Sequence, residues 1–411
     1  MKLPISRGRI SHSLTAEIGW LLRSLGTPLS NSNKVNEAEA AFASYVGRSH
    51  CVVFPFARTA IWSTLKALNL PKGSRVLLPP LTIKPILDVV IHLGYEPIFV
   101  DIDPVTASFD ERELIAAMAT KPSVAILTYL FGLVPRVESL QKTLKDENVF
   151  IIEDFSQCLN GEYNGRKIGT FGDVSIYSAS SVKTFDTFGG GYALTDDAEL
   201  ANALRRFQQS LEAPSRRQIM QGITRNLIRN VASSRLVFPF FTYWFLRLAA
   251  RKSEQAVGRF TGARSTEPLS ELPRDWFRKY SSLQAQVALR ELPRVRRRDK
   301  DRIDRIRQLT SLCDPLDRPR GADHQSHVYW QFLVYVDNFE RAREHFAQFG
   351  VDCATTSLVL LTDLPKYPGQ RKTPAAQRLY ELGVYLPCYH QLHEVEVHRI
   401  SEALRGISAS S

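Results

Sequence analysis

The sequence has few cysteines, and no two of them have metal-binding spacing. Its five cysteines are scattered through 411 residues, and none forms a C-x-x-C motif. This argues against a zinc module or a disulfide framework and is typical of a reducing compartment. Residues 1–26 also lack the uninterrupted apolar stretch of a signal peptide, so we expect a cytoplasmic location.

Acidic residues are absent between Pro214 and Lys252, where eight arginines and lysines occur. This single stretch supplies most of the net charge of +11. The chain has no zinc-finger spacing, no RNA-binding aromatic motif and no heptads beside a basic region, so nucleic acid is not an expected partner. A basic surface also suits an acidic substrate or an anionic membrane.

Short apolar runs alternate with helix-like segments over the first 200 residues. We predict helices near 38–45, 60–68 and 111–118, and strands at 51–54, 75–78, 97–102, 124–131, 149–152, 174–177 and 192–194. Nearly continuous apolar strands separated by helices indicate a mostly parallel sheet covered on both faces. Ligands bind beyond the carboxyl ends of such strands. The polar residues expected at these ends are Thr59, Thr82, Asp154 and Ser178.

The pattern changes after residue 205. Residues 206–265 form a basic and aromatic insertion, with an apolar run at 236–246 between Arg235 and Arg247. This run is too short to span a bilayer, which takes about 20 residues. Three interpretations stay open: a helical flap that packs on its own dimer with its arginines facing solvent, peripheral contact with an anionic membrane through 214–252 at its inner face, or contact with another protein.

The last third of the chain is predicted to form a smaller α/β domain. Residues 285–310 are expected to be a charged helix that kinks or breaks at Pro293. A strand at 329–336 and helices at 339–349 and 395–404 follow. We therefore divide the chain into a large domain, 1–270, and a smaller C-terminal domain, 271–411.

The strongest chemical signal comes from three short motifs. They are IIEDFSQ at 151–157, SIYSASSVKTF at 175–185 and the glycines at 189–191. A pyridoxal 5'-phosphate (PLP) enzyme needs a lysine amine for the Schiff base and a carboxylate for the pyridinium nitrogen. It also needs a hydroxyl and backbone N–H groups for the phosphate, best at a helix N-terminus. Residues 56–61, FARTAI, supply such a turn.

With these motifs the chain resembles the DegT–DnrJ–StrS family of sugar aminotransferases, within the fold-type-I PLP enzymes. The resemblance covers about 36–197, including EPIFVDID at 96–103 and TYLFG at 128–132, and more weakly 277–404. It implies an α/β fold with a mostly parallel seven-stranded sheet covered by helices and a smaller C-terminal α/β domain. It also implies a homodimer with its sites at the interface.

The resemblance implies a role for each matching residue. Lys183 is expected to carry PLP and to move the proton between substrate and cofactor. Asp154 is expected to pair with the pyridine nitrogen, and Gln157 to lie near the ring hydroxyl. The expected phosphate ligands are Ser178, Thr59, Ala60 and Arg58. Arg58 stands where the family usually has glycine, so a phosphate contact, a carboxylate contact and a solvent-facing side chain all stay open.

The chain departs from the family pattern at three other places. Ile83 occupies the position where an aromatic ring often stacks on the cofactor. Residues 277–280 contain no asparagine for the partner's phosphate, and Arg278 or Lys279 is a substitute to consider. The 353–361 segment lacks the His-Tyr-Pro type of sequence found in many sugar aminotransferases, which leaves the acceptor class open.

These observations predict a PLP-dependent transaminase with two small-molecule partners. An amino donor, glutamate by resemblance, would supply the amino group to a keto-sugar or related ketone in glycan, polysaccharide or natural-product biosynthesis. One alternative is a PLP enzyme of another reaction class, against which Lys183 counts because the family's sugar dehydratases have histidine there. The other is a non-catalytic sensor or membrane-associated scaffold with the same fold.

Two further motifs receive no catalytic role. His390-x-x-His393 has no third ligand at a sensible spacing, so no metal site is predicted. Glu153, beside the predicted cofactor residue Asp154, is expected to be structural.

Overall fold

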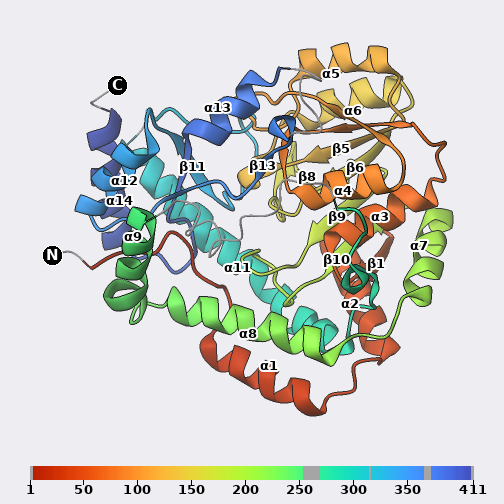
Figure 1. The fold of residues 1–411 in the computed structure, drawn as a ribbon, viewed down its shortest axis with the longest axis horizontal. Helices are drawn as coiled ribbons and strands as arrows, with labels where there is room; N and C mark the ends of the chain where they lie inside the picture. Colours follow the sequence, from red (N-terminus) through yellow and green to blue (C-terminus); the bar gives the residue numbers. More distant parts are fainter. Residues whose placement is uncertain (1–2, 253–268, 314–315, 365–371, 409–411) are drawn as a thin grey trace.

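A seven-stranded sheet forms the centre of the computed structural model, which describes residues 3–252, 269–313, 316–364 and 372–408 (Figure 1). The strand order is β1-β10-β9-β6-β5-β2-β4, and only β10 runs antiparallel to its neighbours. The predicted fold class is therefore confirmed. The strands are β1 (His50–Phe54), β2 (Arg75–Leu78), β4 (Glu96–Phe99), β5 (Val124–Thr128), β6 (Phe150–Asp154), β9 (Val174–Ser178) and β10 (Gly191–Thr195).

Helices cover both faces of this sheet because its strands are apolar on both sides. Ile151 packs into one core and its neighbour Ile152 into the other, as the alternation of a strand requires. The first face is covered by α2 (Ser32–Val46), α5 (Glu111–Ala117), α6 (Val137–Asp146) and the first half of α11 (Ser282–Cys313). The second face is covered by α3 (Ala57–Ala67), α4 (Lys84–His92) and α7 (Ala198–Ser210).

Local signals explain several element boundaries. Asn31 caps α2 by accepting from the Lys34 N–H at 3.4 Å, and the helix stops at Gly47, which has a φ of 97°. Glycine adopts this left-handed conformation without steric cost. The predicted strand at 124–131 is too long, because β5 ends at Thr128 and Phe131 turns the chain with a φ of 59°.

The break predicted at Pro293 does not occur, and the alternative of a kink there stays a prediction. The helix α11 continues from Ser282 to Cys313 across this proline. Apolar side chains on both sides of it, Ala288 and Val295, are buried in the same core. Their packing stabilises the helix and offsets the hydrogen bond that proline cannot donate.

A smaller unit packs beyond the end of α11. It contains the three-stranded sheet β11-β14-β12 and a core to which Ile306 of α11 and Ile5 of the N-terminal segment both contribute. The predicted domain boundary at residue 270 stays a prediction, and α11 joins the two cores. The elements are β11 (Phe332–Tyr335), α12 (Phe339–Gln348), β12 (Ala354–Thr355), α13 (Pro374–Leu382), β14 (Gly383–Leu386) and α14 (Glu394–Ser408).

The remaining elements are short and lie in connections. The strands are β3 (Leu81–Thr82), which pairs with β13 (Val359–Leu360), and β7 (Glu162–Tyr163), which pairs with β8 (Arg166–Lys167). The 3₁₀ turns are η1 (Met118–Thr120), η2 (Leu130–Gly132), η4 (Arg274–Phe277) and η5 (Leu361–Asp363).

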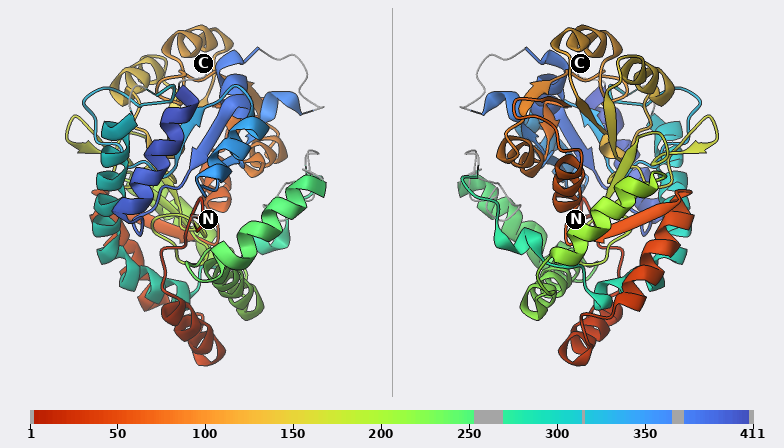
Figure 2. Two further views of the ribbon diagram at one scale, coloured as in Figure 1. Left: turned by 90° about the vertical axis from the view of Figure 1, so that its left-hand side faces the viewer. Right: turned by 90° about the vertical axis from the view of Figure 1, so that its right-hand side faces the viewer.

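The predicted insertion is helical where the structure describes it. α8 (Arg216–Ala232) packs along α1 (Leu14–Gly26), and a π-helical turn, η3 (Phe238–Thr242), leads into α9 (Tyr243–Lys252). Figure 2 shows α9 projecting from the body of the protein. Residues 253–265 of the insertion lie outside the described residues. Within the described ranges, no helix combines the length and apolarity needed to cross a membrane.

Candidate active site

The predicted site residues gather at the carboxyl ends of β5, β6 and β9. Thr128 and Asp154 are the last residues of adjacent parallel strands and are paired in register. Ser178 ends β9 and pairs with Gly191 at the start of β10. Ligands bind at this edge of an open α/β sheet, because the strands end there and loops of several elements meet.

Asp154 is a buried carboxylate at the centre of this edge. Asp154 is only 7% exposed, and this burial raises the pKa of its carboxyl group above the ordinary value. The Ser156 N–H donates to its Oδ1 at 3.0 Å, and this bond and the charge of Lys183 both oppose that rise. Close by, the buried Thr128 hydroxyl makes no hydrogen bond with any described residue. A buried carboxylate and an unpaired hydroxyl at one strand edge indicate that a polar ligand belongs there.

Lys183 lies in the loop that follows β9, close enough to Asp154 for their charges to interact. Burial lowers its pKa from 10.5 to about 8, and the charge of Asp154 partly opposes this effect. Its Nζ lies 3.8 Å from the ring centroid of Trp330, whose indole N–H donates to the Val182 carbonyl at 2.9 Å. Val182 has a φ of 71°, a costly conformation for a β-branched residue. An amine with this pKa is partly neutral near pH 8 and can act as a nucleophile.

A buried polar cluster fixes the far end of the Lys183 loop. Asn226 of α8 donates to the Asp186 carboxylate at 2.7 Å, and the His12 Nε2 lies 3.0 Å from the Asp186 carbonyl oxygen. Glu17 of α1 accepts from Asn230 at 2.9 Å, and burial raises the pKa of Glu17 to about 7. The loop is therefore held by polar contacts that involve α8 and the segment around α1. The short sequence motifs did not predict these contacts.

The start of α3 faces the glycines that follow this loop. Phe56 forms a β-bridge with Gly190, and a Cβ on Gly191 would lie 2.2 Å from the Phe56 carbonyl carbon. Gly190 has a φ of 138°, and a Cβ there would lie 2.8 Å from Tyr280. The glycines at 189–191 are therefore required for β10 to approach the N-terminus of α3. Helix N-termini bind phosphate groups well.

The structure places the three predicted phosphate residues of α3 in different settings. The Thr59 and Ala60 N–H groups both donate to the Phe56 carbonyl, at 3.0 and 3.1 Å. The Thr59 hydroxyl donates to the Trp276 carbonyl at 2.7 Å. The Arg58 guanidinium lies 4.1 Å from the Phe56 ring centroid and 4.4 Å from that of Trp276. Their predicted contact with phosphate stays a prediction.

Ser178 and Gln157 both lie at the edge near Asp154. The Ser178 N–H donates to the Ser156 hydroxyl at 3.0 Å, and its own hydroxyl is 3.2 Å from that of Ser180. The Gln157 side-chain oxygen accepts from the Phe131 N–H at 2.7 Å, which holds the turn after β5. Gln157 therefore positions the neighbouring loop, and its predicted place near the ring hydroxyl stays a prediction.

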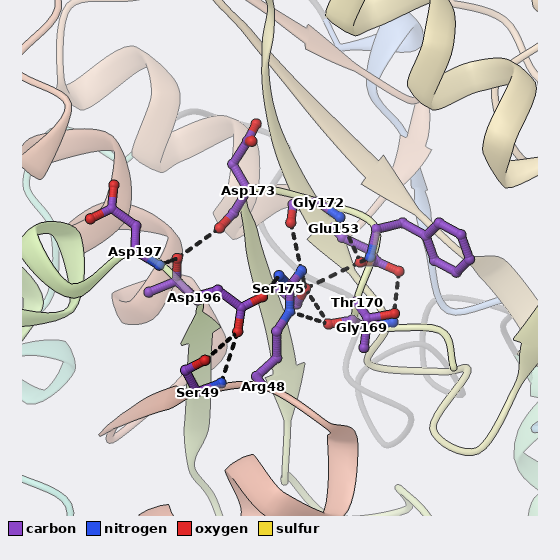
Figure 3. Close-up of polar contacts among 12 residues, drawn as sticks. Arg48, Ser49, Glu153, Gly169, Thr170, Gly172, Asp173, Ser175, Asp196 and Asp197 are labelled. Carbon is purple, nitrogen blue, oxygen red and sulfur yellow. Dashed lines mark hydrogen bonds and ion pairs between the residues drawn. The ribbon is translucent and has the colours of Figure 1, made fainter. Parts of the chain in front are cut away.

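Glu153 has a structural role, as predicted. Its carboxylate points away from the site and accepts from the N–H groups of Gly169, Phe171 and Gly172 at 2.7 to 2.9 Å and from the Ser175 hydroxyl at 3.1 Å. Figure 3 shows this carboxylate and Arg48 converging on the loop at 169–175. Adjacent residues of one strand thus serve opposite faces, Glu153 for the fold and Asp154 for the site.

The other residues considered from sequence lie in ordinary settings. Arg278 forms ion pairs with Glu212 and Asp275, at 3.3 and 3.2 Å. Lys279 lines a cavity of about 460 Å³. His327 accepts from the Val134 N–H at 3.0 Å, and burial lowers its pKa to about 4. No group of three or more metal-binding side chains occurs within the described residues.

The residues at this edge fit PLP by their chemistry. They provide an amine of lowered pKa, a buried carboxylate, an unpaired hydroxyl and a helix N-terminus beside glycines that leave room for backbone approach. Trp330, Thr128 and Ser156 were not predicted. Thr128 could have been found from its position at the end of the predicted strand before the Asp154 strand, because the ends of neighbouring parallel strands lie side by side.

Comparisons with known proteins agree with this arrangement. The sequence model of the DegT/DnrJ/EryC1/StrS aminotransferase family matches residues 12–226 and 278–405. The spore coat polysaccharide biosynthesis protein SpsC of Bacillus subtilis is 31% identical over 191 residues, which cover 46% of this chain and 47% of that protein. The chain thus aligns with about half the length of this curated relative.

Solved structures share the whole fold. An aminotransferase from Psychrobacter cryohalolentis has a TM-score of 0.76 at 18% identity, with 99% of each chain covered. The E. coli GDP-4-keto-6-deoxy-D-mannose-3-dehydratase with bound hydrated PLP has a TM-score of 0.73 at 18% identity, covering 98% of this chain and 100% of that one. The family model matches well over half of the residues, which confirms the family predicted from sequence. The chain belongs to the DegT/DnrJ/EryC1/StrS aminotransferase family.

Proposed function

We propose that this protein is a PLP-dependent aminotransferase that transfers an amino group from an amino-acid donor to a keto-sugar or related ketone. The observation that supports this most directly is Lys183, whose pKa is lowered to about 8 beside the buried carboxylate of Asp154. Bound PLP acts as an electron sink for the substrate carbon that loses a proton. The protein's contribution is to bind, orient and move protons around it.

Lys183 would attach the cofactor and then move a proton at the reacting carbon. Its partly neutral amine suits both tasks, because a nucleophile and a general base must each carry a free electron pair. The Trp330 ring lies with its centroid 3.8 Å from the amine and helps to position it. The strained backbone at Val182 helps to fix the direction of the neighbouring lysine.

Asp154 would hold a proton on the ring nitrogen, and the surrounding polar groups would orient the cofactor. The Ser156 N–H keeps one oxygen of Asp154 in place at 3.0 Å. Ser178 and the N-terminus of α3, with Arg58, Thr59 and Ala60, form the side proposed for the phosphate. Gln157 lies on the side proposed for the ring hydroxyl.

The substrate class is proposed from the relatives. SpsC is named for polysaccharide biosynthesis, and the dehydratase neighbour acts on a GDP-linked keto-sugar. We therefore place the acceptor among keto-sugars or related ketones of glycan, polysaccharide or natural-product biosynthesis, and the donor is glutamate. The natural assembly proposed is a homodimer.

A visible spectrum tests this function. The protein with PLP should show a cofactor absorption band that L-glutamate shifts to that of the aminated cofactor, with release of 2-oxoglutarate. Lys183→Ala should lack the lysine-linked band. A wild-type band that glutamate and glutamine both leave unchanged would contradict the proposed transamination, and no band at all would favour a non-catalytic relative.

A further inference from the structure

Within the insertion, α8 is followed by a second helical segment, which is held to the rest of the protein by contacts at its base. We define the aromatic hairpin as residues 236–248, which include η3 and the first part of α9. Phe238 and Tyr243 are buried within it, with ring centroids 6.0 Å apart. At its base Arg235 donates to the Gln391 carbonyl and to Glu396, at 2.8 Å each. The hairpin therefore has a defined position although α9 projects from the body (Figure 2).

The outer face of the aromatic hairpin is apolar and exposed. Leu236 is 79% exposed and Phe241 70% exposed. Every exposed phenylalanine and tryptophan of the described residues lies between positions 240 and 245. The spacing i, i+1, i+4, i+5, i+8 places these side chains on one helix face. They are Phe240, Phe241, Trp244, Phe245 and Leu248. A contiguous exposed face of this kind indicates an interaction surface.

The segment that carries this face, residues 214–252, is rich in basic residues. Arg225 and Arg229 are exposed one turn apart on α8. Arg247 lies within the hairpin, where it donates to the Tyr243 hydroxyl at 3.2 Å. No aspartate or glutamate occurs between 214 and 252. The surface therefore complements a partner that is both apolar and negatively charged.

The aromatic hairpin is separate from what the family shares. The family model matches residues 12–226 and 278–405, so the hairpin lies in the unmatched interval. The chemistry proposed above uses residues inside the matched ranges. The proposed chemistry therefore does not use the hairpin, and its exposed apolar face requires a separate explanation.

We propose that the aromatic hairpin binds the surface of an anionic lipid bilayer. The phenylalanines, Trp244 and Leu248 insert at the boundary between headgroups and acyl chains, while the neighbouring arginines contact lipid phosphates. The apolar run of 236–246 is too short to cross the bilayer. Contact between two copies of this face would bring two arginine-rich segments together, which electrostatic repulsion opposes. An anionic bilayer supplies the charge that a second copy of the face lacks.

Vesicle co-sedimentation of the full-length protein tests the proposal. The wild type should bind vesicles of phosphatidylcholine with 30% phosphatidylglycerol and should bind pure phosphatidylcholine vesicles far more weakly. Raising the salt from about 0.1 to about 0.5 M should release much of the bound protein. The double variant Phe241→Ser, Phe245→Ser should bind roughly tenfold more weakly. Trp emission should shift to shorter wavelength on the vesicles, and Trp244→Phe should remove most of this shift.

The matched control replaces two exposed apolar residues elsewhere. Ile115→Ser with Val105→Ser changes side chains that are 61% and 50% exposed on α5 and in the loop that precedes it, and it should bind like the wild type. Equal binding by wild type and the Phe241/Phe245 variant would overturn the proposal, as would wild-type protein that does not bind anionic vesicles. Sedimentation velocity measures whether the substitutions change the oligomeric state. If the phenylalanine variant alone dissociates into smaller species, the hairpin contacts a second copy and the lipid proposal is wrong.

Discussion

The site around Lys183 and the aromatic hairpin depart from ordinary burial in opposite ways. At the site, charged groups such as Lys183 and Asp154 are withdrawn from bulk water, which is costly without a partner. On the hairpin, apolar rings such as those of Phe241 and Trp244 remain in water. The first departure supports the proposed polar cofactor, and the second supports the proposed contact with a lipid surface. We therefore expect substitutions at the site to change aminotransfer, and substitutions on the hairpin to change vesicle binding.

The largest expected effect belongs to Lys183. Lys183→Ala should lower aminotransfer roughly 10³-fold or more, because it removes both the attachment point and the group that moves the proton. The measurement is turnover of L-glutamate with a keto-sugar acceptor. Lys142→Ala, an exposed lysine paired with Asp146, is the control and should keep full activity. Turnover by Lys183→Ala within tenfold of the wild type would remove Lys183 from the mechanism.

Asp154→Asn should have the next largest effect. An amide cannot hold the ring nitrogen in its protonated form, so kcat should fall roughly 10²-fold while the protein remains folded. Steady-state kinetics and a thermal unfolding curve measure the two quantities. Asp146→Asn, at an exposed carboxylate, is the matched control. A stability loss without a change in kcat would give Asp154 a purely structural role.

Glu153→Gln, at the neighbouring residue, should lower the stability of the fold, whereas Asp154→Asn should lower kcat. The carboxylate accepts four hydrogen bonds in a buried position, and an amide would place N–H groups against some of these donors. The free energy of unfolding should fall by about 2–4 kcal/mol. Urea unfolding measures this change. An unfolding free energy unchanged within about 0.5 kcal/mol would contradict the account of the loop at 169–175.

The pKa of Lys183 predicts how cofactor binding depends on pH. Only the neutral amine attacks, so the rate of PLP attachment should rise about tenfold per pH unit up to about pH 8 and then level off. Stopped-flow absorbance between pH 6 and 10 follows this rate. An ordinary lysine has a pKa of about 10.4, so a rate that still rises between pH 9 and 10 would show that the site does not lower the lysine pKa.

The smallest effect is expected on the hairpin. Phe241→Ser with Phe245→Ser should change the free energy of unfolding by less than about 0.5 kcal/mol and leave aminotransfer of soluble substrates unchanged, because both rings are exposed. Thermal unfolding and steady-state kinetics check this. A loss of more than about 1 kcal/mol would support the flap packed on the protein itself.

Sequence reasoning reached the sheet and the core of the site because both depend on short local patterns. Apolar runs marked all seven strands, and the spacing of Asp154, Ser178 and Lys183 indicated their common edge. The break predicted at Pro293 does not occur, because the packing of Ala288 and Val295 outweighs the local effect of proline. Such packing joins residues distant in sequence and has no local signal.

The missing site residues have the same explanation. Trp330 reaches Lys183 from 147 positions along the chain. The contacts to Asp186 come from His12, in the segment before α1, and from Asn226 of α8. The hairpin was described from sequence as basic and aromatic, but only the structure separates the buried rings of Phe238 and Tyr243 from the exposed ones. The exposed fractions therefore identify which aromatic residues of the hairpin are available for a partner.

The most direct test of the central claim locates the cofactor on the chain. The protein is incubated with PLP, reduced with borohydride, digested and mapped by mass spectrometry. We predict a pyridoxyl group on Lys183, and its loss when excess L-glutamate is added before reduction. A label on another lysine, or none on the folded protein, would contradict the assignment of Lys183 and with it the proposed aminotransferase mechanism.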